Sequence, residues 1–356
     1  MLRTPLCRSL PLAAALLASL LALSPSAPAT AKTVTDMAKT TVTVPDAPKK
    51  VYALSPPDSL LVYAIDPCVL AGWNFKPFPP AKAFMPACAA NLPILGGFFG
   101  QGMVPNKEGL LAAKPDLVIS GTMARSNPEF DKFFTDMGIP VVHIDSESPD
   151  NYPADFRFLG EALGKKERGD ALAAAADKTL TVLRAGLAKI PQDKRLTVYY
   201  AEGGDGLYTD GAGSFHTMVI EMAGGVNVHK KPQSRRFGMD KVTMETVMGY
   251  APQAILVQDA KCRDMILTSP LWKDIPAVKS GKVFLIPDAP FNWFDRPPSF
   301  MRLLGAKWMA HALYPEVFSY DMVKETQAFF KLYLQKDISA DEAKALLAGK
   351  NPHRGK

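Results

Sequence analysis

A short helix–strand pattern occurs twice in this chain, and it limits the possible fold more than any other feature. Residues 108–115 begin with a glutamate, end at a proline and lead into the apolar run 116–120. Residues 245–252 do the same and lead into the apolar run 253–257. A residue that precedes proline is biased away from the helical conformation, so each copy predicts a short helix that stops before a buried strand.

Strand-like runs at residues 50–54 and 196–200 precede the two copies at matching places. Each copy with its preceding strand makes one α/β unit, and the chain is long enough to bury two such units. We therefore expect two similar lobes in an α/β fold.

Residues 165–189 lie between these units and contain no proline. Apolar side chains recur there at helical spacing, at Leu172, Ala176, Leu180, Leu183 and Leu187. The pattern predicts one amphipathic helix of about 24 residues, roughly 36 Å long. A helix of that length can cross a whole lobe, so the expected architecture is two Rossmann-like lobes joined by one long rigid α-helix, with a ligand cleft between the lobes.

The N-terminus resembles a secretory signal peptide. Arg3 and Arg8 flank a short basic region, residues 10–23 are apolar, and residues 29–31 form a small-residue cleavage site. Cys7 precedes the apolar run, which argues against a lipid-anchored cysteine. We expect a mature periplasmic protein that begins near Lys32.

Removing residues 1–31 takes away two arginines and no acids, which lowers the net charge from +6 to +4. This charge is too small to favour nucleic-acid binding. In an oxidising compartment Cys68 and Cys88 can form a disulfide and leave Cys262 unpaired, although the sequence leaves a bonded pair and two free thiols equally open.

The segment 292–299 carries aromatic, acidic and basic side chains between prolines, directly after the strand-like run 282–286. Ligands in open α/β sheets bind at the carboxyl ends of the strands. Trp293, Phe294 and Arg296 are therefore expected to contact a ligand. The alternative is that the aromatic pair is buried in the core.

The order of signal peptide, lobe, long helix and lobe resembles the substrate-binding proteins of bacterial ABC importers for iron complexes and cobalamin. The acid-to-proline stretch before residues 116–120, its second copy, and the Trp293-Phe294-Asp295-Arg296 loop carry the resemblance. It covers residues 49–315 and implies the fold of a class III periplasmic binding protein. The expected divisions are a signal peptide at 1–31, an N-terminal lobe at 32–164, a linking helix at 165–190, a C-terminal lobe at 191–348 and a disordered tail at 349–356.

The resemblance implies that one glutamate on each lobe docks against the membrane permease, and Glu108 and Glu245 stand at the matching positions. Two separated charge pairs fix orientation without demanding high affinity. The alternative is that both acids only favour the dipole of their own helix. The implied partners are an ABC permease and ATPase, and we expect a monomer.

Further ligand contacts are expected from loops that face the cleft. In the first lobe these loops are 55–57 after the first strand, 73–75 with Trp73, Asn74 and Phe75 after the apolar turn 69–72, and the glycine-rich loop 96–102 with Phe98, Phe99 and Gln101.

The second lobe supplies the remaining expected contacts. Strand alternation sends one of Tyr199 and Tyr200 toward the cleft, and we expect it to be Tyr200. The guanidinium groups of Arg235, Arg236 and Arg296 suit an anionic ligand, because their planar forks bind oxyanions.

Catalytic and metal-ligating patterns are weak. The five histidines are scattered and show no zinc-binding spacing, so neither catalytic nor metal-ligating residues are expected, and no cofactor. Residues 211–216 lack the glycine of a hydrolase elbow, and Ser214 is expected to cap a helix at 217–223. A secreted hydrolase remains the rival class.

Aromatic walls with arginine suit a metal already wrapped in an organic ligand. A ferric siderophore is the first expectation, with haem or cobalamin as further choices. A small oxyanion such as molybdate, or a nickel chelate, is the alternative. At the C-terminus, residues 299–313, 320–335 and 339–348 predict helices, of which the first two are expected to pack on the second lobe.

Overall fold

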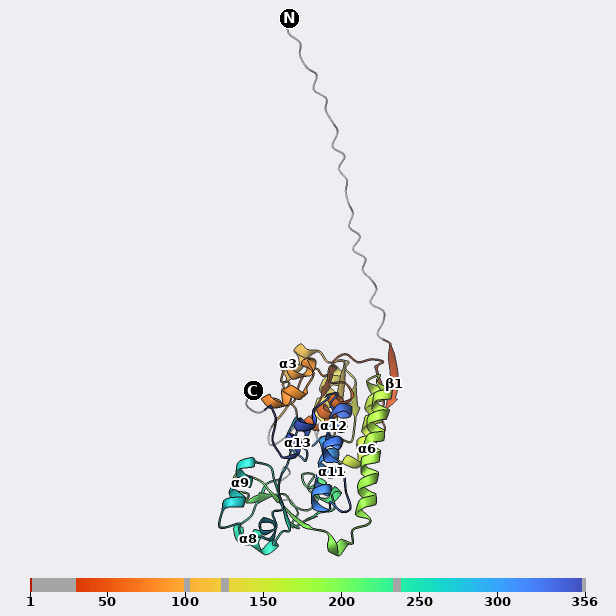
Figure 1. Ribbon diagram of the computed structural model, residues 1–356. Coiled ribbons are helices and arrows are strands. Elements are labelled where there is room, and N and C mark those ends of the chain that lie inside the picture. The colour runs from red at the N-terminus through yellow and green to blue at the C-terminus, as the bar shows by residue number, and fades with distance from the viewer. Residues whose placement is uncertain (2–29, 99–102, 123–127, 233–237, 354–356) are drawn as a thin grey trace.

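The computed structural model describes residues 1, 30–98, 103–122, 128–232 and 238–353 (Figure 1). The expected signal peptide falls almost entirely outside these ranges. Four expected ligand contacts also lie outside them, namely Phe99, Gln101, Arg235 and Arg236.

The N-terminal lobe is built on three parallel strands in the order β3-β4-β5. They are β3 (Val51–Ala53), β4 (Leu117–Ser120) and β5 (Val141–His143), preceded by an antiparallel hairpin of β1 (Ala31–Thr35) and β2 (Thr41–Pro45). The helices of this lobe are α1 (Pro56–Ile65), α2 (Ala87–Ala90), α3 (Lys107–Ala113), α4 (Pro128–Asp136) and α5 (Tyr152–Ala162), with 3-10 turns at Pro79–Phe84 and Pro149–Asn151. All four residues of β4 are buried, as expected for a parallel strand with both faces covered.

The C-terminal lobe repeats this plan with four parallel strands in the order β11-β10-β6-β8. The strands are β6 (Thr197–Ala201), β8 (Val226–Asn227), β10 (Ala254–Val257) and β11 (Val283–Leu285), and a small antiparallel pair joins β7 (Tyr208–Thr209) to β9 (Asp240–Lys241). Its helices are α7 (Met218–Met222), α8 (Met244–Tyr250), α9 (Ala260–Thr268) and α10 (Pro276–Lys279), with a 3-10 turn at Gln192–Lys194.

One long helix, α6 (Lys166–Leu187), runs along the side of the molecule between the lobes (Figure 1). It packs closely on α5, because Gly160 and Gly169 bring the two backbones together where a Cβ atom would clash. The fold of two α/β lobes joined by one long helix is therefore confirmed, as are the two copies of the helix–strand pattern.

The C-terminal helices are α11 (Met301–Leu313), α12 (Met322–Tyr333) and α13 (Ala340–Leu347). The expectation that residues 320–335 pack on the second lobe is confirmed only in part, because α12 contacts α11 through Phe329 and Glu325 but also packs on the first lobe. The ring of Phe330 contacts Phe84 edge-on, and the ring of Tyr333 lies against Phe156. The Tyr333 hydroxyl donates a hydrogen bond to the carbonyl of Leu172 at 3.2 Å. The chain thus returns to the first lobe and ties the two lobes together.

The expected disordered tail also needs correction for its described part. His353 lies against the ring of Phe84 at a centroid distance of 4.9 Å and 3.2 Å from the carboxylate of Glu342. The imidazole of His353 thus contacts both the ring of Phe84 and the carboxylate of Glu342, and these contacts hold the tail as far as His353.

Cys68 and Cys88 form a disulfide, which decides between the two states that the sequence left open. Cys262 is a buried free thiol in the second lobe. Within the described part of the chain, no helix combines the length and the apolar character that crossing a membrane requires.

Candidate ligand-binding site

A cavity of about 440 Å³ lies between the two lobes. The first lobe contributes Phe75, Lys76 and Phe78, which follow the bridge between Trp73 and Ile94. The second lobe contributes Gln258, directly after β10, and several residues of the loop 288–297, which follows β11. The cavity therefore opens at the carboxyl ends of parallel strands, where ligands bind in open α/β sheets.

Arg296 lines this cavity and is held by three buried carboxylates. Its Nε donates to Glu202 Oε1 at 3.0 Å, and its Nη2 donates to Asp210 Oδ2 at 3.2 Å. Asp295 Oδ2 lies 3.4 Å from Nε. The Arg296 side chain is 30% exposed, whereas the three acidic side chains are 0% exposed. Most of the guanidinium is thus engaged within the protein, and only one edge remains for a ligand.

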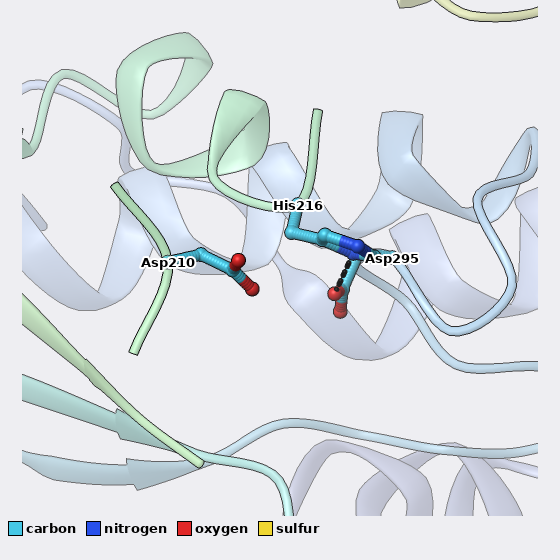
Figure 2. Close-up of side chains that lie close together, drawn as sticks. All are labelled: Asp210, His216 and Asp295. Atoms are coloured by element: carbon cyan, nitrogen blue, oxygen red, sulfur yellow. Dashed lines mark hydrogen bonds and ion pairs between the residues drawn. The ribbon is translucent and has the colours of Figure 1, made fainter. Parts of the chain in front are cut away.

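Asp295 is the centre of a second set of contacts (Figure 2). The Tyr200 hydroxyl donates to its Oδ1 at 2.7 Å, and His216 Nδ1 lies 2.6 Å from its Oδ2. Burial alone would raise the pKa of Asp295, but the hydrogen bond with His216 and the charge of Arg296 hold the pKa below its usual value. Asp295 is therefore a charged anchor for both His216 and Arg296.

Glu202 differs from its neighbours in its protonation. Burial, with the nearby charges of Asp210 and Asp295, raises the pKa of Glu202 to about 9, although Arg296 opposes the shift. Its Oε2 atom has no hydrogen-bond partner among the described residues. Burial therefore favours the protonated form of Glu202, while Arg296 also contacts Asp210 and Asp295.

Asp210, His216 and Asp295 bring one donor atom each to within 4.8 Å of one another, a cluster that the scattered histidines of the sequence did not predict (Figure 2). Their oxygen and nitrogen donors are of the types that bind divalent metals. However, Arg296 already pairs with both carboxylates. A cation at this place would have to displace a guanidinium, so the group fits an internal ion network better than a resident metal.

Trp73 and Asn74 do not line the cavity, because both are buried in the first lobe. Trp73 Nε1 donates to the carbonyl of Ala89 at 2.8 Å. Asn74 Nδ2 donates to the carbonyls of Ala53 and Gly96 at 2.8 and 2.9 Å. These two side chains hold the loops that carry Phe75 and Lys76.

Phe98 is likewise part of the first lobe's core. It is 8% exposed, and its ring stands edge-on to Phe130 at a centroid distance of 4.8 Å. A direct ligand contact from this side chain would require the loop to move away from Phe130.

Trp293 and Phe294 are each 0% exposed, so the alternative that they are buried in the core describes their position. Trp293 Nε1 donates to the carbonyl of Ala289 at 3.1 Å, and Phe294 stands edge-on to Trp308 of α11. The backbone of Gly305 in α11 lies so close to the Trp293 carbonyl that a Cβ atom there would clash. Helix α11 thus covers the aromatic pair.

Tyr199 and Tyr200 point to opposite faces of β6, as strand alternation requires. Tyr199 joins the core around Trp272. Tyr200 is also fully buried, but its hydroxyl reaches Asp295 and Gln258, beside the cavity. Tyr200 therefore contacts a residue of the cavity wall, Gln258, without lining the cavity itself.

The sequence interpretation missed several residues of the cavity wall, among them Lys76, Phe78, Gln258 and Phe291, although it placed Phe75 and Asn292 in loops that were expected to contact the ligand. Gln258 carried a usable signal, because it directly follows a predicted strand. Glu202 carried the same signal at the end of β6, whereas Asp210 and His216 carried none, because only the fold brings them to Arg296.

Ser214 does not cap the helix expected at residues 217–223. The helix runs over Met218–Met222, and its N-cap residue Thr217 makes no side-chain cap bond. Ser214 Oγ instead accepts from the backbone N–H of His216 at 3.1 Å, which fixes the turn that presents His216 to Asp295.

Glu108 and Glu245 are exposed at the second residue of α3 and of α8. They do not line the cavity, and their helices α3 and α8 lie near opposite ends of the molecule (Figure 1).

Comparison with known proteins agrees with this architecture. Residues 98–290 match the family model described as periplasmic binding protein. The molybdate-binding protein MolA of Haemophilus influenzae is 31% identical over 261 residues, which cover 67% of this chain and 72% of that protein.

Solved structures show the same similarity. An ABC transporter solute binding protein from Sulfurospirillum deleyianum is 36% identical, with a TM-score of 0.82 over 88% of this chain and 98% of that chain. The structure of Haemophilus influenzae MolA bound to molybdate is 26% identical, with a TM-score of 0.67 over 86% of this chain and 99% of that chain. The chain therefore belongs to the periplasmic binding protein family and is a substrate-binding protein of an ABC transporter.

Proposed function

We propose that this protein captures a metal chelate in the interlobe cavity and delivers it to a membrane permease. The observation that carries the proposal is the cavity lining, which combines Phe75 and Phe78 with polar groups from both lobes, while the ring of Phe291 in this lining is 4% exposed and packs on Tyr63 and Trp73. Flat apolar faces stack on an organic ligand, while the polar groups fix its orientation.

The size of the cavity supports a chelate. A volume of about 440 Å³ falls within the range of sites for drug-sized ligands. The described lining residues carry both signs of charge, with Lys76 and Arg296 basic and Asp259 and Asp288 acidic. A small ion held by charge alone gains little from such a lining, whereas a chelate with several functional groups can use both signs. A ferric siderophore is our first candidate, and haem or cobalamin are further candidates.

A small oxyanion such as molybdate is the second candidate. The relative from Haemophilus influenzae binds molybdate and shares 31% of its residues with this chain over the aligned region. Lys76 and the free edge of Arg296 are the cationic groups that an oxyanion would use in the described cavity. A nickel chelate stands beside the oxyanion as part of this alternative.

Secretion and docking complete the proposal. Residues 1–31 act as a cleavable signal peptide that sends the mature protein to the periplasm as a monomer. Glu108 and Glu245 then dock the loaded protein against the permease, which works with its ATPase. Both acids are exposed on separate lobes, so two charge pairs with the permease would set the orientation of docking.

The test is a calorimetric titration of residues 32–356 with ferric siderophores, haem, cobalamin, a nickel chelate and molybdate. We expect saturable binding of one organic chelate with one molecule per protein. Saturation by molybdate alone would transfer the proposal to the oxyanion. The absence of saturable binding for every ligand tested would contradict both candidates.

A further inference from the structure

Helices α3 and α8 are two copies of one capped structure. In α3 the side chain of Asn106 accepts from the backbone N–H of Gly109 at 3.0 Å. In α8 the side chain of Thr243 accepts from the backbone N–H of Thr246 at 3.2 Å. Each cap residue bonds to the N–H three residues later, which satisfies an end group of the helix.

The two helices also end alike. The residue that follows each helix is left-handed, with φ of 50° at Lys114 and 44° at Ala251. A buried proline comes next, Pro115 in one lobe and Pro252 in the other, and a fully buried strand follows. The number of residues that separates corresponding positions of the two copies is the same throughout.

The copies match on their solvent face as well. The second residue of each helix is an exposed glutamate, Glu108 or Glu245. Three residues later each helix presents an apolar side chain to solvent, Leu111 at 52% exposed and Met248 at 52% exposed. Residues three apart on a helix lie on the same face, so each acid has an apolar neighbour.

A single exposed apolar residue needs no explanation, because most protein surfaces carry some. The same exposed position in two lobes, each time beside an acid on a helix of the same geometry, is a repeated surface. A partner surface that fits it carries a basic residue next to an apolar pocket, and carries this pair at two places.

We propose that Leu111 and Met248 are apolar docking contacts for the transporter's membrane permease, one on each lobe, and this inference rests on the docking role proposed above for Glu108 and Glu245. Helices α3 and α8 lie near opposite ends of the molecule, so one small partner does not reach both (Figure 1). A permease with two equivalent subunits offers the required surface twice. The acid guides encounter and orientation, while the apolar side chain is desolvated in the complex and slows its dissociation.

The first lobe carries the larger apolar surface. Ile94, Met103 and Val104 are 46%, 50% and 60% exposed. They flank the start of α3, where the backbone N–H of Asn106 donates to the carbonyl of Leu95 at 2.8 Å. The first lobe therefore contributes more apolar contact, and the effect of Leu111 is expected to exceed that of Met248.

The experiment measures binding of the cargo-loaded protein to its own permease–ATPase complex in lipid nanodiscs. The variants are Leu111→Ser, Met248→Ser and the double variant. Leu267→Ser/Leu271→Ser is the matched control, because these side chains are 40% and 69% exposed in the second lobe but lie outside the repeat. Cargo binding and thermal unfolding are recorded for every variant.

We expect the double variant to dock at least about tenfold more weakly, with unchanged cargo affinity and an unchanged dependence on salt. The control is expected to dock like the wild type. A Glu108→Gln/Glu245→Gln variant separates the two ideas, since its loss of docking is expected to diminish as salt is raised.

Wild-type docking by the double Ser variant, while the Gln variant docks weakly, would overturn the apolar contacts and leave the docking role of the acids intact. Wild-type docking by both variants would overturn both. A photo-crosslinker at position 111 or 248 is expected to capture the permease, and capture of a second copy of this chain would overturn the choice of partner.

Discussion

Arg296 donates hydrogen bonds to Glu202, a buried acid whose protonated form is favoured by its surroundings. Arg296 Nε donates to Glu202 Oε1 at 3.0 Å, and burial raises the pKa of that carboxyl to about 9. Arg296 also contacts Asp210 and Asp295. This pairing positions the cationic edge of the cavity before any ligand arrives, so no further ordering of Arg296 is needed on binding.

Replacing Asp295 by asparagine is expected to destabilise the fold strongly. The variant leaves His216 without its buried partner charge and removes one of the two aspartates that contact Arg296, and breaking a buried pair in this way costs about 3–5 kcal/mol. Urea unfolding at pH 7 measures the change. Asp193→Asn is the control, because Asp193 is 73% exposed beside Lys194 and should change stability by less than about 0.5 kcal/mol. A loss for Asp295→Asn as small as the control's would mean that the network carries no stability.

Replacing Glu202 by glutamine tests its protonation. The pKa of Glu202 is raised from 4.5 to about 9 in the folded state, so the fold binds this proton more tightly than the unfolded chain does. Its contribution to stability is thus complete below pH 4.5 and declines as the pH rises toward 9. The wild type is expected to lose stability over that window relative to Glu202→Gln. Parallel pH curves for the two proteins would show that Glu202 is ionised, and exposed Glu316→Gln supplies the control curve.

Replacing His143 by glutamine is expected to matter most in acid. His143 Nδ1 lies 2.8 Å from Asp36 and Nε2 lies 2.9 Å from Asp131, and only the protonated ring donates to both. The hydrogen bond with Asp131 raises the pKa of His143 above 6.5, assisted by Asp36 and opposed by burial. This contribution is complete below pH 6.5 and is lost as the pH rises through the folded-state pKa.

Unfolding of His143→Gln at pH 5.5 and pH 9 makes the comparison. The deficit relative to wild type is expected to be larger at pH 5.5. An equal deficit at both values would rule out the charged bridge between the N-terminal hairpin and α4.

Removing the disulfide with Cys68→Ser/Cys88→Ser is expected to lower the free energy of unfolding by about 3 kcal/mol, since the bond closes a loop with a sequence separation of 20. Thermal unfolding with and without a reducing agent measures the effect. The double variant is also the control for the reducing agent, because the agent should not shift the unfolding midpoint of a protein that lacks this disulfide. A wild-type midpoint that is insensitive to reduction would contradict a stabilising bond.

The sequence predicted the fold well because its signals were local or repeated. The long helix was visible in the spacing of Leu172, Leu180 and Leu183, and the two copies of the acid-to-proline stretch marked equivalent helices and strands. Tyr333 was harder to place. Its contact with Phe156 depends on where the chain turns after α11, and no local pattern encodes that.

The site was predicted less well. The loop after β11 was located correctly, but Trp293 and Phe294 are covered by α11, whereas Phe291 and Asn292 face the cavity. Residue type and the preceding strand show where such a loop begins. They do not show which of its side chains a following helix will bury. The partners of Arg296 are equally invisible in the sequence, because they come from segments that meet only in the folded lobe.

The central claim is that the cargo binds in the interlobe cavity, and calorimetric titration of cavity variants with the identified ligand tests it most directly. Lys76→Ala and Phe291→Ala alter the two walls of the cavity, whereas Lys178→Ala alters a groove on α6 and is the control. We expect each cavity variant to weaken binding at least about tenfold while the control binds like the wild type. Wild-type affinity in both cavity variants would contradict the claim and place the ligand elsewhere.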